Sequence, residues 1–233
     1  MADIAAMLPS LWAPLVLSLK VAALATVASF VMGTAVAWGM ARRKGNLPAF
    51  LDALCTLPLV LPPTVLGYYL ILLVGRRGLI GPWLQEVGVN LIFSWHGAVV
   101  AATVVVFPLV YKSSRAALEQ VDRRYEDAAR TLGASEARIL FTISLPLAWR
   151  GIFAGTSLAF ARGMGEFGAT LMLAGNIPGK TQTLALAIYD AFQQGDDASA
   201  TALVLVTSLL CVTALVLAEQ LTSRRRRKRH AAR

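Results

Sequence analysis

The sequence predicts an all-α membrane protein with five transmembrane helices. Of its 233 residues, 57% are hydrophobic and only 15% are charged. The mean hydropathy is +0.62, which is too apolar for a domain surrounded by water. A transmembrane helix needs roughly 20 mostly apolar residues. Five stretches reach that length, at about residues 14–41, 54–74, 91–111, 152–174 and 198–218.

Lysine and arginine predict the orientation of these spans, because cytoplasmic loops retain positive charge. Basic residues follow the first span at 42–44, the third span between 112 and 150, and the fifth span at 224–233. We therefore expect a periplasmic N-terminus and a cytoplasmic C-terminus. Residues 1–223 would form the transmembrane domain. The basic tail at 224–233 directly follows an apolar span, which favours contact with anionic lipid over nucleic acid.

Several kinds of chemistry find no support in the sequence. Cys55 and Cys211 lie far apart in apolar stretches, without the spacing of a metal site or a disulfide framework. The glycine-rich loop that holds nucleotide phosphates is absent. We expect no metal or cofactor in this chain, no enzymatic activity of its own, and no ATP hydrolysis by it. The first residues lack a basic region and a cleavage site, so the first span is expected to be retained.

The second span contains helix breakers at Pro58, Pro62, Pro63 and Gly67. A broken helix is tolerated in lipid only where it faces protein or a watery path, so this span is predicted to line a pore. A shorter apolar piece at residues 183–192 is bounded by turn residues. It is too short to cross, and reads as a short helix or a re-entrant segment.

The polar segment at residues 118–146 lies between the third and fourth spans. Its pattern predicts two short helices separated at Gly133, which can adopt a left-handed conformation. Ser135 can cap the second helix. Pro146 then marks the bend into the membrane. The plainest interpretation is a solvated loop whose charges fix topology.

The spacing within this segment resembles the signature loop of ABC importer permeases. The matching residues are Asp127, Ala128, Ala129, Gly133, Ile143, Ser144, Leu145 and Pro146. The family pattern usually begins with glutamate, and Asp127 retains that charge on a shorter side chain. The resemblance implies the type I importer permease fold and a coupling loop that docks on an ATPase subunit. It implies coupling roles for Glu126, Asp127, Ala128, Ala129, Gly133, Leu145 and Pro146.

A second stretch, at residues 161–183, resembles the molybdate permease subunits through its arginine, glycine, glutamate, phenylalanine, glycine run and an Asn-Ile-Pro-Gly turn. The resemblance implies molybdate import across the bacterial inner membrane by two copies of this chain. Two ATPase subunits would bind ATP and Mg, and a periplasmic oxyanion-binding protein would supply the ion. Sulfate, thiosulfate and tungstate permeases are close relatives and stay as alternatives. A secondary transporter is a further alternative, although no internal repeat supports it.

Six residues are candidates for the translocation path or its gate: Pro62, Pro63, Thr64, Arg162, Glu166 and Thr170. Arg162 and Glu166 stand four apart, so on one helix they would share a face and form an ion pair. Charges at membrane depth are rare and usually functional. The pair could equally lock the fourth span to a neighbouring helix. Direct ion binding by Glu166 is not expected, because a carboxylate repels a dianion.

Overall fold

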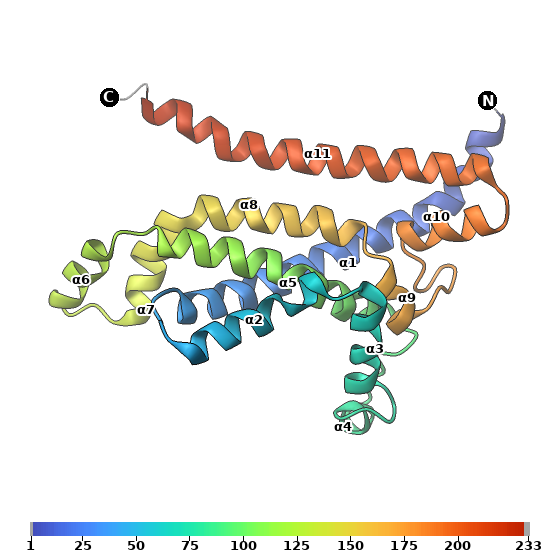
Figure 1. The fold of residues 1–233 in the computed structure, drawn as a ribbon. Coiled ribbons are helices and arrows are strands. Elements are labelled where there is room, and N and C mark those ends of the chain that lie inside the picture. Colours follow the sequence, from blue (N-terminus) through green and yellow to red (C-terminus); the bar gives the residue numbers. More distant parts are fainter. Residues whose placement is uncertain (1, 231–233) are drawn as a thin grey trace.

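The computed structural model describes residues 2–230, and side chains for residues 12–217, 219 and 220. Every regular element in this part of the chain is a helix (Figure 1). The helices are α1 (Ala2–Ala41), α2 (Asn46–Val60), α3 (Pro63–Val74), α4 (Gly81–Glu86), α5 (Trp95–Glu119), α6 (Arg123–Thr131), α7 (Glu136–Ile139), the π-helix η1 (Leu140–Ser144), α8 (Leu145–Met164), α9 (Gly168–Ala174), α10 (Leu184–Gln193) and α11 (Asp197–His230).

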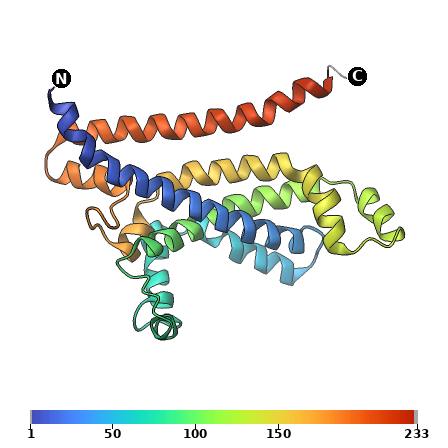
Figure 2. The ribbon, with the colours of Figure 1, turned by 180° about the vertical axis from the view of Figure 1, so that it is seen from behind.

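Helix α5 forms the centre of the bundle and packs most extensively on α1 and α8 (Figures 1 and 2). Small residues let these helices approach closely. A Cβ added to Gly155 would lie 2.2 Å from the Cβ of Ser113, and one added to Gly33 would lie 3.2 Å from the main-chain nitrogen of Tyr111. The centre of the protein is thus held by close helix packing.

The expected all-α fold with up to five spans is confirmed. Four helical stretches are long and apolar enough to cross a membrane: Trp12–Ala41, Trp95–Glu119, Glu136–Met164 and Asp197–Leu217. Helices α2 and α3 pass the same test together, with a bend of 116° between them. Pro62 and Pro63 explain this break, because proline lacks the main-chain N–H that would continue the helix. The second span is therefore a bent pair.

The stretch expected as the fourth span, residues 152–174, is two helices rather than one. Helix α8 ends at Met164, and α9 begins only at Gly168. At the other end, the helical stretch reaches back through η1 to Glu136. Figures 1 and 2 show the chain changing direction where this segment meets α8, close to Pro146 as predicted.

Three other helix limits differ from the expected spans. Helix α1 begins before residue 14, and α5 runs from Trp95 to Glu119 because Ser94 caps its start and the charged residues after Tyr111 remain helical. Helix α11 continues to His230 through most of the basic tail, of which residues 231–233 lie outside the described part. The apolar piece at 183–192 forms the ten-residue helix α10.

One charged cluster fastens α2 to α5. The carboxylate of Asp52 accepts hydrogen bonds from Tyr111 Oη at 2.8 Å, Lys112 Nζ at 2.7 Å and Arg115 Nη1 at 2.5 Å. All three donors lie on α5. This cluster holds the first half of the bent pair in place.

Candidate functional site

The polar segment folds as two short helices, as its sequence predicts. Asp122 caps α6 by accepting a hydrogen bond from the main-chain N–H of Arg124 at 3.0 Å, and Ser135 caps α7 through the N–H of Arg138. Between them Gly133 has a φ of +79°. That left-handed conformation favours glycine. The turn is thus built as expected.

Glu126 anchors this segment to the bundle. It is buried, its Oε1 lies 3.0 Å from Arg42 Nη2 at the end of α1, and the same oxygen accepts a hydrogen bond from Ser144 Oγ in η1 at 2.8 Å. Arg42 also donates to the main-chain oxygen of Val121. These bonds join α1, α6 and η1.

The other side of the segment faces outward. Asp127, Ala128 and Gly133 are exposed and Ala129 is half-buried. Leu132 has 87% of its surface exposed, and nothing within this chain covers it among the described residues. An exposed leucine beside two small residues is suited to contact with another protein.

Arg130 braces this outward face. It pairs with Asp127 at 2.7 Å and with Glu136 at 2.6 Å, so it joins α6 to α7 across the Gly133 turn. The hydrogen bond to Glu136 is the largest influence raising the pKa of the Arg130 guanidinium above its usual value. The arginine therefore stays charged.

The two last residues of the signature loop lie apart from this face. Leu145 packs against the buried cluster that includes Tyr111 and Ile152, whereas Pro146 is exposed in the first turn of α8. Leu145 therefore holds the start of α8 in the core.

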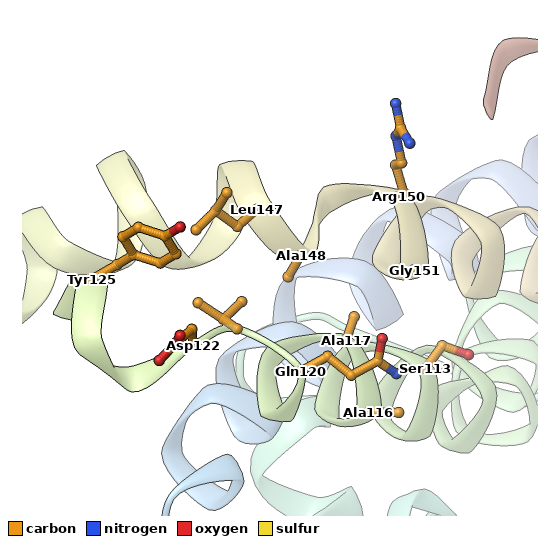
Figure 3. A pocket seen from close by; sticks show the side chains of 11 residues that line it. Ser113, Ala116, Ala117, Gln120, Asp122, Tyr125, Leu147, Ala148, Arg150 and Gly151 are labelled. Atoms are coloured by element: carbon orange, nitrogen blue, oxygen red, sulfur yellow. The ribbon is translucent and has the colours of Figure 1, made fainter. Parts of the chain in front are cut away.

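An open groove of about 650 Å³ lies beside the segment, between the end of α5 and the start of α8 (Figure 3). Tyr125 and Leu147 lie at one end of it, and Ser113 and Gln120 lie toward the other. Arg150 points away from the groove (Figure 3). The groove extends the outward face of α6 along the bundle.

A second site forms where the two broken spans meet. A Cβ added to Gly168, at the start of α9, would lie 2.8 Å from the Cβ of Pro63, at the start of α3. One added to Gly67 would lie 2.6 Å from the Cβ of Met172. Helices α3 and α9 therefore start together and pack along each other. We call this junction, made of residues 62–64 and 165–168, the break junction.

Arg162 and Glu166 form the expected ion pair, with Arg162 Nη1 3.0 Å from Glu166 Oε2. Glu166, however, lies beyond the end of α8, in the break. Its other oxygen accepts a hydrogen bond from the main-chain N–H of Ala169 at 3.0 Å, so it caps α9. The expectation of two charges on one helix face was wrong. The carboxylate stabilises the start of the next helix.

The remaining path candidates are divided between surface and interior. Pro62, Pro63 and Thr64 are exposed. Thr170 is buried, and its hydroxyl has no hydrogen-bond partner among the described residues. The structure thus brings Pro62, Pro63 and Thr64 to the same junction as Glu166, while Thr170 points into the protein.

Sequence reasoning missed the partners that fix these two sites. Arg42 was considered only as a topology signal, and Ser144 only as part of a motif, yet both bind Glu126. The ring of Phe167 in the break packs at an angle of 59° against the ring of Tyr189 in α10, with ring centroids 5.1 Å apart. The sequence shows Glu126 next to the signature loop, but its burial and its partners come only from the tertiary structure. No sequence signal links Phe167 to Tyr189.

Known proteins share this architecture. Residues 29–227 match the family described as binding-protein-dependent transport system inner membrane component. The chain belongs to this family. The permease is therefore a multi-pass protein of the inner membrane and a component of a transport system.

The permease is similar to two curated relatives over most of its length. The molybdenum transport system permease protein ModB of Escherichia coli strain K12 is 47% identical over 90% of this chain and 93% of its own. ModB of Haemophilus influenzae is 44% identical over 91% and 93%. A solved structure of the MetNI methionine ABC transporter superposes with a TM-score of 0.68, at 15% identity, over 96% of this chain and 97% of that chain. The last likeness concerns the fold alone.

Proposed function

We propose that the permease moves molybdate across the inner membrane as the membrane-spanning subunit of an ABC importer. The observation that carries this proposal is the 47% identity to a molybdenum transport permease over 90% of the chain. Two separate ATPase subunits bind ATP and Mg and supply the energy. A periplasmic oxyanion-binding protein supplies the ion, and this chain hydrolyses no ATP.

The anchored α6–α7 segment is the connection to the ATPase. Its outward face carries four of the residues that the signature loop assigns to coupling: Asp127, Ala128, Ala129 and Gly133. Glu126 holds its inner face to α1 and η1. When the ATPase subunits close, they move this segment, and the bundle changes between two states whose balance the partners shift. The buried hydrogen bonds of Glu126 would make the spans move with the segment.

Two copies of the permease form one path. In a single copy, α11 packs mainly on α8 and α10. Helix α2 leaves Leu54, Leu57 and Val60 exposed. Arg162 is also exposed, although it belongs to a membrane helix. A second copy related by symmetry would cover part of this surface and enclose the path between them. The N-terminus lies in the periplasm and the C-terminus in the cytoplasm, which follows from the distribution of basic residues.

The test is molybdate uptake in proteoliposomes that contain the permease, its ATPase and its binding protein. Gly133→Asp should abolish both uptake and the stimulation of ATP hydrolysis by loaded binding protein. An added Cβ at Gly133 meets nothing within 4 Å in this chain, so the substitution acts mainly on the partner face and the turn. Uptake by the wild type without an ATPase would instead indicate a secondary transporter. Preference for sulfate over molybdate in competition would reassign the ion.

A further inference from the structure

The strongest feature without a defined role in the proposed function is the exposed guanidinium of Arg162. Its side chain is 40% exposed, whereas its partner Glu166 is 2% exposed. On α8, Ala154, Leu158 and Arg162 are exposed at intervals of four residues, so they form one open stripe. Arg162 therefore faces outward from the single copy, and its side chain is only partly covered by the rest of the chain.

Arg162 lies about halfway across the bundle. Helix α8 runs antiparallel to α5, because Gly151 lies against Ala117 while Gly163 lies against Val106. Val106 is near the middle of α5 (Trp95–Glu119). A charged guanidinium that faces lipid at this depth is strongly unfavourable. The open stripe must therefore face protein or a water-filled path.

The pair with Glu166 leaves most of the guanidinium free. Glu166 Oε2 is close enough for an ion pair, but it has no hydrogen-bond partner among the described residues. Glu166 is held instead by its other oxygen, on Ala169. An arginine has five N–H donors arranged to bind oxyanions in a bidentate manner. Arg162 thus keeps donors for a second acceptor.

The start of α3 adds positive potential to the same junction. Its first turn has no side-chain cap, and Thr64 is exposed there. The first main-chain N–H groups of a helix lack acceptors within the helix, and they carry part of the helix dipole. A Cβ on Gly168 would lie 3.5 Å from the nitrogen of Thr64, so this helix start lies beside the residues that Glu166 caps.

The geometry points to Arg162 as the group that binds the passing oxyanion at mid-membrane, with Glu166 as a fixed counter-ion that competes with it. This inference rests on the proposed function and names the contact within its path. The ion takes the free donors of Arg162. Glu166 remains in place, because its cap on α9 holds it. The opposed charges keep the ion weakly bound, which allows rapid release. Glu166 is a positioning residue and does not touch the ion.

The first experiment measures retention of radiolabelled molybdate by the purified permease–ATPase complex without binding protein. Glu166→Gln removes the competing charge, while the amide oxygen can still accept from Ala169. We expect the dissociation constant of this variant for molybdate to be at least about tenfold lower than that of the wild type. The double variant with Arg162→Gln should return to wild-type retention. Equal retention by wild type and Glu166→Gln would overturn the inference, as would full retention by the double variant.

The second experiment separates transport from coupling in the complete proteoliposome system. Arg162→Gln should lower uptake at least about tenfold while loaded binding protein still stimulates ATP hydrolysis, and Arg162→Lys should retain part of the uptake because it keeps the charge. Lys44→Gln removes an equal charge from the exposed turn between α1 and α2 and should change neither quantity. Normal uptake by Arg162→Gln overturns the inference and leaves the proposed function intact. If Arg162→Gln loses uptake, stimulation of ATP hydrolysis and thermal stability together, Arg162 is a structural residue, and the inference is overturned as well. Failure of the wild type to take up molybdate would instead refute the proposed function.

Discussion

Two buried glutamates fasten the two places where this permease departs from straight helices. Glu126 pairs with Arg42 and accepts from Ser144, and Glu166 pairs with Arg162 and caps α9. In each case one carboxylate joins segments that are separate in the fold. A buried carboxylate is costly unless it is paired or hydrogen-bonded. Arg42 and Ser144 meet this cost at Glu126, and the main-chain N–H of Ala169 helps to meet it at Glu166.

Substitution of Glu126 tests this at the residue scale. Glu126→Ala leaves Arg42 and Ser144 without their partner, and we expect the free energy of unfolding to fall by about 2 kcal/mol. Asp127→Ala is the matched control, because Asp127 is exposed and its surface ion pair with Arg130 should contribute little to stability. The measurement is thermal unfolding in detergent. Equal stability of the two variants would show that Glu126 does not anchor the segment.

At the scale of helices, the break junction depends on glycine where α3 and α9 pack. Gly67→Ala would place a Cβ 2.6 Å from that of Met172 and 3.2 Å from Cα of Ala169. Overpacking of this kind usually costs about 1–3 kcal/mol, so we expect a lower unfolding temperature. Gly39→Ala in α1 meets no atom within 4 Å and should be neutral or stabilising, by up to about 1 kcal/mol. A tolerated Gly67→Ala would mean that the two short helices separate readily.

The turn between α6 and α7 allows a different test. Gly133 has a left-handed φ, and a Cβ added to it would meet no atom within 4 Å. Glycine is therefore favoured here by the backbone conformation and not by packing within the chain. Gly133→Asn tolerates this conformation better than Gly133→Ala, for which the strain is about 1 kcal/mol. If the turn alone matters, uptake by the asparagine variant should exceed uptake by the alanine variant. Equal loss in both would indicate that the partner requires the missing side chain itself.

The sequence predicted the helices of the polar segment well and the limits of the spans less well. Caps and a left-handed glycine are local signals, so α6 and α7 could be placed from Gly133 and Ser135 alone. Apolar length is a weaker signal, because hydropathy continues across residues 165–167 while the helix stops. The break depends on Glu166 reaching Ala169 and on Gly168 packing against Pro63. These contacts require the tertiary structure.

For the whole molecule, the number of spans decides which side of the membrane each end occupies. If the bent pair crosses the membrane as one span, it makes an odd number together with the four other apolar stretches, and the two ends would lie on opposite sides. If α2 and α3 instead entered and left the membrane on the same side, the N-terminus and the α6–α7 segment would no longer fit the distribution of basic residues. Orientation is thus a test of the bent pair as well.

Labelling of single cysteines with an impermeant maleimide resolves this in intact cells. Cys55 and Cys211 are first replaced by alanine, and cysteine is then placed at exposed Gln194, between α10 and α11, or at exposed Arg124 in α6. We expect Gln194→Cys to react from outside, because it precedes the last span, and Arg124→Cys to react only after the membrane is permeabilised. This result would place α6 on the cytoplasmic side, where the proposed ATPase partner binds. Labelling of both positions from outside would contradict this expectation. It would require α8 and α9 to turn back within the membrane, and the α6–α7 segment could not reach the ATPase subunits.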